Sequence, residues 1–448
     1  FGPFELPGGD PIALGALLAV LPLLVVKPWK PSKSPRNFLV ACAVSAIVLS
    51  RLYFTAYLRG GPRIIDAAAY TFQARTFASG AVAFASRAPL AATLGRFVVA
   101  TPDGRLAGIF PPGWPLVLAI GHRLGLPNLA PLALAGALPL ATYAVARKFA
   151  RGAGDDRGPR LAALLVVLSA PLRYFGAEPM AHGLCALLIL LFFWALPTIT
   201  TATEDRGRSL ATSAAAGLAV GALATTRFAS AFAPAVLLAA ALLGRRTTRT
   251  FAHSFAAFAG LAVPLALLFG YQSRVTGDAF RPAQSVYYAL TDGPIGCFRY
   301  GFGRGIGCQF EHGPFVAARL PNGYSTGAAL GTTARRLALH LGDLGNQEFT
   351  GVLTLLAVVA GLRARGRGRR LLGALPPLHV VAYAPFYFDG NYPGGGARLL
   401  ADVLPIEAVL LGLWIAESGP LFRLKGIKTP PQAAHFSAAL VVASLVGF

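Results

Sequence analysis

The stretch MAHGLCALLILLFFWALPT, which runs from Met180 to Thr198, contains no Asp, Glu, Lys or Arg. A helix of about 20 apolar residues is long enough to cross the hydrocarbon core of a bilayer. The rest of the chain has the same character, since its 448 residues are 55% hydrophobic and only 13% charged, whereas soluble domains average about 25% charged residues. We therefore expect an all-α polytopic membrane protein in which residues 1–448 form a single membrane domain.

Other apolar windows of this kind lie on both sides of that stretch and predict a bundle of about 11–13 transmembrane helices. A shorter apolar stretch at 113–126 is expected to be a re-entrant or surface helix. The other windows lie at 11–27, 38–58, 129–147, 160–177, 210–226, 228–243, 252–272, 350–363, 371–387, 399–416 and 432–448.

Basic residues dominate the links between these windows. The chain has 40 Lys and Arg against 18 Asp and Glu, and its formal charge is +22. Because cytoplasmic loops are rich in Lys and Arg, we assign the basic links to the cytoplasm and to contacts with anionic membrane lipids, and we expect no nucleic acid partner. The opposite side then receives a first extracytoplasmic loop at 59–112, with surface helices, and a second at 273–349. The high content of Ala, Gly and Arg is typical of a GC-rich bacterial genome, so the expected location is a bacterial inner (cytoplasmic) membrane.

An acid begins a short predicted helix in the first loop. Asp66, Tyr70 and Gln73 are spaced by four and three residues, so they share one helical face. Asp66 is a candidate catalytic base, and Tyr70 and Gln73 are candidate pocket residues. The alternative is that Asp66 only caps the helix, where an acid is favourable.

Ionisable groups also occur where two apolar windows meet the outer side. Glu178 and His182 are four residues apart, so they could share a pocket or a divalent metal, although two ligands at this spacing are also typical of a polar turn. Arg398 follows the glycine-rich run 392–397 and is a candidate for binding phosphate, with a snorkelling interfacial arginine as the alternative. Arg227, at another outer corner, is a weaker candidate of the same kind.

The second loop contains a pair of cysteines around a glycine-rich run. Cys297 and Cys308 would form a disulfide if the loop lies in an oxidising compartment. The run 301–307 lacks the strand–turn–helix context and the Lys-Ser/Thr ending of a phosphate loop, which excludes a nucleotide site of that type. Glu311 and His312 follow the second cysteine and are candidate pocket residues.

The order of several motifs is similar to that in bacterial GT-C glycosyltransferases of the dolichyl-phosphate-mannose–protein mannosyltransferase type, glycosyltransferase family 39. The resemblance covers roughly residues 38–416 and implies a GT-C-like bundle that passes a sugar from a polyprenyl-phosphate donor to an extracytoplasmic acceptor. It also implies that Asp66 acts at the acceptor, as base or orienting carboxylate, and that Arg398 binds the donor phosphate. The motifs are Asp66 to Arg75, Phe110 to Pro115, Ser169 to Pro171, Glu178 to His182, Thr276 to Phe280 and Gly396 to Arg398.

One departure from that family keeps a second function open. Family members commonly carry Asp-Glu where this chain has Asp66-Ala67, so the alternative is a catalytically degenerate GT-C-like scaffold or accessory subunit of a larger membrane complex. A transporter ranks last, because the acids are expected mainly at helix ends rather than along a path through the spans. No cofactor is assigned, and a requirement for a divalent metal stays open.

Overall fold

The computed structural model describes residues 34–86, 96–151, 156–200, 206–244, 250–291, 297–346, 348–390 and 396–417. Nearly all of its regular structure is helical, which confirms the predicted all-α class. Of the predicted spans, those at 11–27 and 432–448 lie outside the described residues, and each of the others coincides with a helix or a pair of helices. The helices of the bundle are α2 (Pro35–Leu52), α6 (Leu129–Phe149), α7 (Arg157–Leu168), α8 (Ala170–Ala177), α9 (His182–Thr200), α10 (Arg206–Thr226), α11 (Phe228–Leu243), α12 (Thr250–Thr276), α16 (Glu348–Leu362), α17 (Arg367–Tyr383) and α18 (Leu404–Glu417).

Among the described residues, five helical segments are long and apolar enough to span a membrane, and α7 with α8 would make a sixth. Three further apolar helical stretches, 182–197, 228–243 and 350–362, are shorter. The lipid-facing character is plainest on α12, where Phe251, Phe255 and Phe258 are exposed. The protein is therefore a multi-pass membrane protein.

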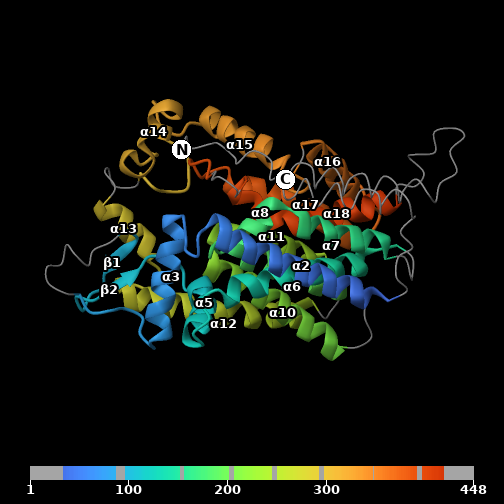
Figure 1. The fold of residues 1–448 in the computed structure, drawn as a ribbon, viewed down its shortest axis with the longest axis horizontal. Helices are drawn as coiled ribbons and strands as arrows, with labels where there is room; N and C mark the ends of the chain where they lie inside the picture. The colour runs from blue at the N-terminus through green and yellow to red at the C-terminus, as the bar shows by residue number, and fades with distance from the viewer. Residues whose placement is uncertain are drawn as a thin grey trace, which may run out of the picture.

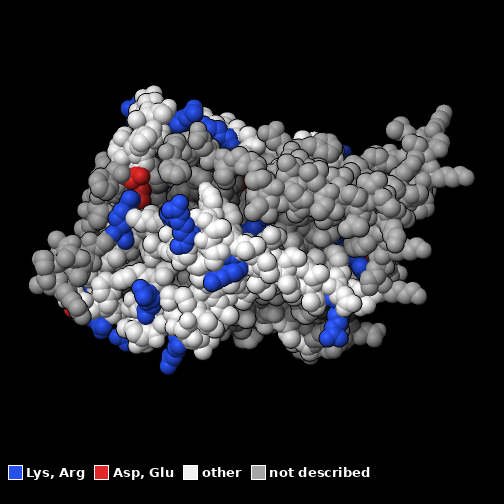
Figure 2. Space-filling model, viewed as in Figure 1, with Lys and Arg blue, Asp and Glu red and all other residues white. Residues whose placement is uncertain are grey.

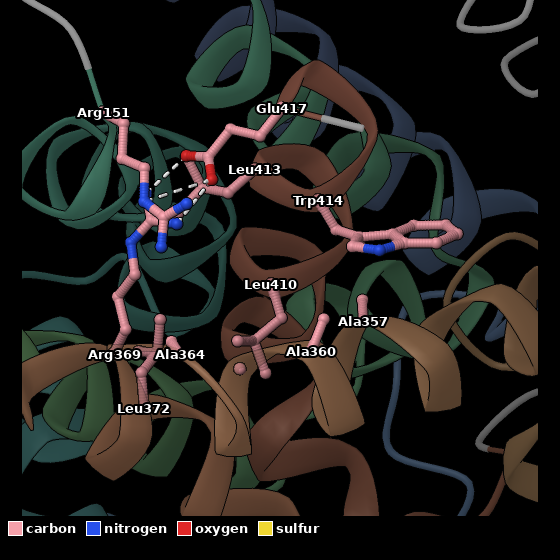
Figure 3. Close-up of a pocket in the computed structure, with 11 residues that line it drawn as sticks. Arg151, Ala357, Ala360, Ala364, Arg369, Leu372, Leu410, Leu413, Trp414 and Glu417 are labelled. Carbon is pink, nitrogen blue, oxygen red and sulfur yellow. Dashed lines mark hydrogen bonds and ion pairs between the residues drawn. The ribbon is translucent and has the colours of Figure 1, made fainter. Parts of the chain in front are cut away.

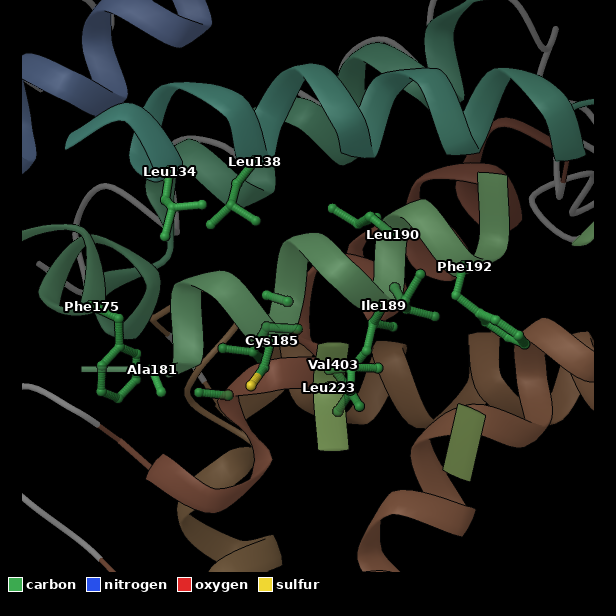
Figure 4. Packing of buried hydrophobic residues seen from close by; sticks show 14 of the residues in the cluster. Leu134, Leu138, Phe175, Ala181, Cys185, Ile189, Leu190, Phe192, Leu223 and Val403 are labelled. Carbon is green, nitrogen blue, oxygen red and sulfur yellow. The ribbon is translucent and has the colours of Figure 1, made fainter. Parts of the chain in front are cut away.

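The centre of the bundle is α9, the helix formed by the stretch that begins at Met180. Most of its side chains, such as Cys185, Ile189 and Phe193, are fully buried, whereas Leu191 and Trp194 are exposed. A helix that is apolar on every face can pack into the protein on one side and face lipid on another. Figure 4 shows α9 residues packed against Leu134 and Leu138 of α6 on one side. This packing fixes the position of α9, whose first residue, His182, belongs to a polar network of the candidate site.

The segments outside the bundle gather at one end of it. Figure 1 shows α3 (Ile65–Ala78), α5 (Gly113–Arg123), α13 (Ala283–Thr291) and the antiparallel hairpin of β1 (Val98–Ala100) and β2 (Leu106–Gly108) together at the left, with α14 (Gln309–Arg319) above them. α15 (Thr326–His340) continues from α14 across the bundle. The short hairpin was not predicted. α5 has 11 residues, too few to cross a bilayer.

Two short irregular helices complete the described fold. The π-helix η1 (Tyr53–Tyr57) extends α2, and the 3-10 helix η2 (Arg398–Val403) leads into α18. On the face drawn in Figure 2, basic side chains are scattered widely, whereas acidic ones are prominent at the upper left, in the region between α13 and α14.

The break between α7 and α8 places one loop beside η2. The two helices are bent by 59°, because Pro171 in the first turn of α8 disfavours a continuous helix through the preceding residues. Backbone groups freed at the break find partners in the loop after α15: Asn346 accepts from the Ala170 N–H at 3.0 Å and donates to the Leu168 carbonyl at 2.8 Å. The Ser169 hydroxyl donates to the Asp343 carbonyl at 2.8 Å. Asp343 is thereby held next to the start of η2.

Candidate functional site

The two residues that the sequence placed at the centre of the site form an ion pair. Arg398 Nη1 lies 2.6 Å from Asp66 Oδ2, although 332 positions separate them in the chain. Their side chains are 9% and 17% exposed, respectively, so the pair lies near the surface yet is largely enclosed. Asp66 is in the first turn of α3, whose N-cap is Ile64. Its carboxylate therefore does not cap the helix, although its charge still complements the helix dipole there.

A buried glutamate holds the start of α3. Glu178 Oε1 accepts hydrogen bonds from the backbone N–H groups of Arg63 and Ile64, at 2.8 and 3.1 Å. The Glu178 side chain is fully buried, and burial raises its pKa while the two N–H groups oppose that rise. Because the contact fixes the chain immediately before Asp66, Glu178 acts as a positioning residue.

The segment that precedes Arg398 is held by a second carboxylate. Asp343 Oδ2 accepts from the backbone N–H of Ala397 at 3.1 Å and lies 3.0 Å from His340 Nδ1. The other ring nitrogen of His340 lies 3.0 Å from Glu407. Burial acts to lower the pKa of His340, but the two carboxylates raise it to about 10. Position 396 suits glycine, because its φ is +56° and an added Cβ would lie 2.0 Å from Asp343 Oδ1.

A second polar network, on α9, α11, α17 and η2, lies inside the bundle. His182 Nδ1 donates to Asp402 Oδ1 at 2.6 Å, and the Ser230 hydroxyl donates to Asp402 Oδ2 at 2.5 Å. Arg227 donates to His182 Nε2 at 3.3 Å and to the Tyr383 hydroxyl at 3.0 Å. The carboxylate of Asp402 is fully buried, and its contacts offset the cost of removing it from water.

The two networks are within electrostatic range of each other around Tyr70. Burial raises the pKa of Tyr70, the positive charges of Arg227 and Arg398 oppose the rise, and the negative charge of Asp66 adds to it. Arg227, Arg398 and Asp66 thus all act electrostatically on Tyr70 at this end of the bundle.

The second loop contributes aromatic and titratable groups on the same side. His312 stacks on Phe388 with ring centroids 3.7 Å apart, and its Nδ1 lies 2.7 Å from the Tyr387 hydroxyl. Burial and, to a lesser extent, the charge of Arg398 lower the pKa of His312 to about 4, against the opposing effect of Asp66. His312 is therefore a neutral ring close to the ion pair.

Glu311, the neighbour of His312, connects the two loops. Its carboxylate lies 2.5 Å from Arg96 Nη2 of the first loop. The Arg96 side chain is 43% exposed, which limits the strength of this pair. The Cys297–Cys308 disulfide is present in the structure and ties the start of α14 to the segment that follows α13. Cys42 and Cys185 are free and buried.

Tyr70 and Gln73 are buried side chains. The ring of Tyr70 stacks on Phe110 at 4.2 Å between centroids, and the Gln73 amide donates to the Phe110 carbonyl and the Tyr271 hydroxyl at 2.9 and 3.0 Å. The predicted polar face of α3 is therefore packed into the protein beyond Asp66. The reason is that acceptors on α12 and before α5 bind the amide N–H groups of the glutamine, which the pattern of α3 alone does not reveal.

Glu178 and His182 do not form a common metal site either. They share a helical spacing, yet Glu178 is turned to the chain before α3 and His182 to Asp402. The chain is not helical between them, since α8 ends at Ala177 and α9 begins at His182, with Pro179 in between. In the part of the chain that the structure describes, no group of three or more His, Cys, Asp or Glu side chains is arranged to hold a metal ion.

Sequence reasoning missed Asp343, His340, Asp402 and Glu407. A signal was present for the last two, because both acids lie inside the predicted span 399–416, where ionisable groups are costly and usually functional. Asp343 and His340 carried no such signal, since they lie in a polar loop whose fold was not predictable.

Comparison with known proteins assigns the fold. No family model matches the chain, and no curated protein matches it. Among solved structures, apo ArnT from Cupriavidus metallidurans superposes with a TM-score of 0.56 at 15% identity over 92% of this chain and 74% of that one. ArnT bound to undecaprenyl phosphate gives a TM-score of 0.55 at 14% identity over 93% of this chain and 75% of that one.

An oligosaccharyltransferase has the same fold. The apo enzyme from Archaeoglobus fulgidus gives a TM-score of 0.54 at 14% identity over 94% of this chain, which spans 56% of that protein's length. AglB from the same organism, in complex with an inhibitory peptide and a dolichol-phosphate, gives 0.51 at 13% identity over 92% of this chain and 56% of that one. The chain therefore has the GT-C fold that the motifs predicted.

Proposed function

We propose that this protein is a membrane glycosyltransferase that moves a sugar from a polyprenyl-phosphate donor to an acceptor on the extracytoplasmic side of a bacterial inner membrane. Asp66 is the base, and Arg398, assisted by Arg227, binds the donor phosphate. The observation that carries the proposal is the ion pair between Asp66 and Arg398, formed by segments at opposite ends of the described chain on a GT-C scaffold. Lipid phosphates bound to ArnT and AglB support the donor class.

The charges suit the reaction. The acceptor atom attacks the anomeric carbon of the sugar, the bond from that carbon to the phosphate oxygen breaks, and the polyprenyl phosphate leaves with the bonding electrons. The acceptor proton passes to the Asp66 carboxylate. Fixed guanidinium groups stabilise the negative charge that develops on the departing phosphate.

The ion pair itself implies an order of events. While Arg398 is bound to Asp66 Oδ2 at 2.6 Å, that oxygen is occupied and is a weaker base. The phosphodiester of the donor carries one negative charge on two non-bridging oxygens that can accept both arms of the guanidinium, so it competes for Arg398 and releases Asp66. In this proposal the base becomes active only when donor is bound, which limits wasteful hydrolysis.

The scaffold alternative has one structural observation in its favour. Ala67, which stands where a second acid is common in GT-C family members, is fully buried in the hydrophobic core. That position serves packing in this chain and supplies no second carboxylate. The alternative predicts donor binding without transfer, and constant association with other membrane subunits.

The test compares purified wild-type protein with Asp66→Asn in lipid nanodiscs. A panel of undecaprenyl-phosphate sugars is supplied with membrane extract as acceptor, and released undecaprenyl phosphate is followed by mass spectrometry. Asp66→Asn is expected to lower kcat by about 10²–10⁴-fold and Arg398→Lys to raise the donor KM. Asp103→Asn, an exposed acid of the same loop, is the matched control. Equal rates for wild type and Asp66→Asn would reject Asp66 as the base, and donor binding without release would favour the scaffold.

A further inference from the structure

A cavity of about 270 Å³ lies at the other end of the bundle from Asp66 and Arg398. It is enclosed by α16, α17 and α18, and α18 leads away from η2, where Arg398 is located, to end at Glu417 beside the cavity. In Figure 3 the side chains of Leu410 and Trp414 flank it from α18, with Ala360 of α16 opposite. Nothing in the proposed transfer reaction uses this site.

The inner wall of the cavity is apolar and its α16 side consists of small residues. Leu372, Leu410 and Leu413 are buried side chains that line it. Small residues line this side: Ala357, Ala360 and Gly361 of α16, and Ala364 just beyond its end. We call the part of the cavity along them the slot. Its volume is below the roughly 300–1,000 Å³ of sites that enclose a drug-sized ligand, so the slot suits one flexible apolar chain rather than a rigid molecule.

The mouth of the cavity is basic. Arg369 is fully engaged, since it donates to the Phe149 carbonyl at 2.9 Å and to Glu417 at 2.6 Å. Glu417 is neutralised by that pairing. Arg151 lies at 3.7 Å from Glu417 and its side chain is 62% exposed, so its guanidinium is available to a further anion (Figure 3).

The surroundings add positive charge at this level. Arg147 and Lys148 end α6, and five arginines occur between Arg363 and Arg370, around the junction of α16 and α17. Lys148 lies 3.7 Å from the ring centroid of Trp194. Arginine and lysine next to tryptophan at helix ends are typical of the boundary between membrane and water. The cavity therefore opens at the depth where lipid phosphates lie.

We propose that this cavity binds an anionic phospholipid, with one acyl chain in the slot along α16 and the phosphate on Arg151. The positive charge at the mouth attracts an anionic head group. The apolar slot binds the acyl chain, so a head group without a chain would bind weakly. The phospholipid would join α6, α16, α17 and α18 at the end of the bundle opposite the ion pair.

Native mass spectrometry of the full-length protein in detergent tests the proposal. Wild type is titrated with palmitoyl-oleoyl phosphatidylglycerol and, separately, with the phosphatidylcholine of the same chains. We expect one retained phosphatidylglycerol, with about a five-fold preference over phosphatidylcholine, and about a five-fold loss of affinity in Arg151→Gln. Arg123→Gln removes an exposed arginine at the end of α5, outside the cavity lining. It is the charge control and should bind as wild type does.

The slot is tested by a second pair of variants on α16. Ala360→Phe places a ring in the cavity and should abolish the retained lipid, whereas Val359→Phe, at the adjacent exposed position outside the cavity lining, should not. Glycerol 3-phosphate should displace none of the lipid, because it lacks the chain. The proposal is overturned if wild type shows no preference for phosphatidylglycerol. That is the result expected if another part of this chain filled the slot. It is also overturned if each variant binds like its control.

Discussion

Replacing Asp343 by alanine should weaken the binding of phosphate by Arg398, although Arg398 itself is unchanged. The Asp343 carboxylate is buried and accepts a hydrogen bond from the backbone N–H of Ala397. Ala397 is the residue immediately before Arg398. The same oxygen lies 3.0 Å from His340 Nδ1. In Asp343→Ala the N–H of Ala397 loses its partner, and His340 keeps only Glu407.

The magnitude follows from these two contacts. A buried donor left without a partner costs about 1–3 kcal/mol, so the two together should lower the free energy of unfolding by about 2–6 kcal/mol. A hydrogen bond from Arg398 to phosphate contributes about 1.5–3 kcal/mol. If the freed segment loses half of that free energy, the affinity of Arg398 for a lipid phosphate falls about four- to twelve-fold. Asp343→Asn keeps one acceptor for the Ala397 N–H and should lie between wild type and alanine.

Affinity for undecaprenyl phosphate is measured in detergent by microscale thermophoresis, and Tm by thermal shift in the same buffer. Leu353→Ala is a core truncation on α16, a helix that provides no partner in the hydrogen bonds of Asp343 and Arg398. It supplies a comparable loss of about 2–5 kcal/mol. It should lower Tm and leave lipid-phosphate affinity unchanged. If Asp343→Ala and Leu353→Ala bind the lipid equally well, Asp343 does not position Arg398.

Three further predictions use Tm as the readout. Glu178→Ala leaves the buried N–H of Ile64 and the part-buried N–H of Arg63 without their acceptor and should cost about 2–4 kcal/mol. Glu178→Gln, which keeps an acceptor oxygen, should recover most of the loss; equal Tm values for the two variants would contradict the positioning role. Burial lowers the pKa of His312 to about 4 in the folded protein, below its value in the unfolded chain. The stability that neutral His312 contributes is therefore fully present above about pH 6.5. As the pH falls toward 4, the free energy of unfolding decreases by up to about 3 kcal/mol. His312→Gln, which can still accept from Tyr387, should show a shallower fall of Tm over that window, and an unchanged slope would show that His312 is not neutral in the fold. Gly217→Ala places a Cβ 1.8 Å from the Ala257 carbonyl oxygen and should cost about 1–3 kcal/mol by forcing α10 from α12; a wild-type Tm would mean that the two helices separate freely.

The amino-acid sequence alone determined the membrane class and most of the helices. Apolar windows such as 180–198 and 399–416 are long relative to the bilayer, and this signal depends only on local composition. The motif order was sufficient to indicate the GT-C fold. Asp66 and Arg398 could be selected individually because a charge next to an apolar span is rare and informative.

Only the tertiary structure decided which of those residues meet. The ion pair between Asp66 and Arg398 joins positions 332 apart, and Glu178 was separated from His182 although the two are close in sequence. Helical periodicity predicts which residues share a face, but not what that face contacts, as Gln73 shows by turning to Phe110 and Tyr271. Partners for buried polar groups come from distant segments, so their identity depends on how helices pack rather than on any local pattern.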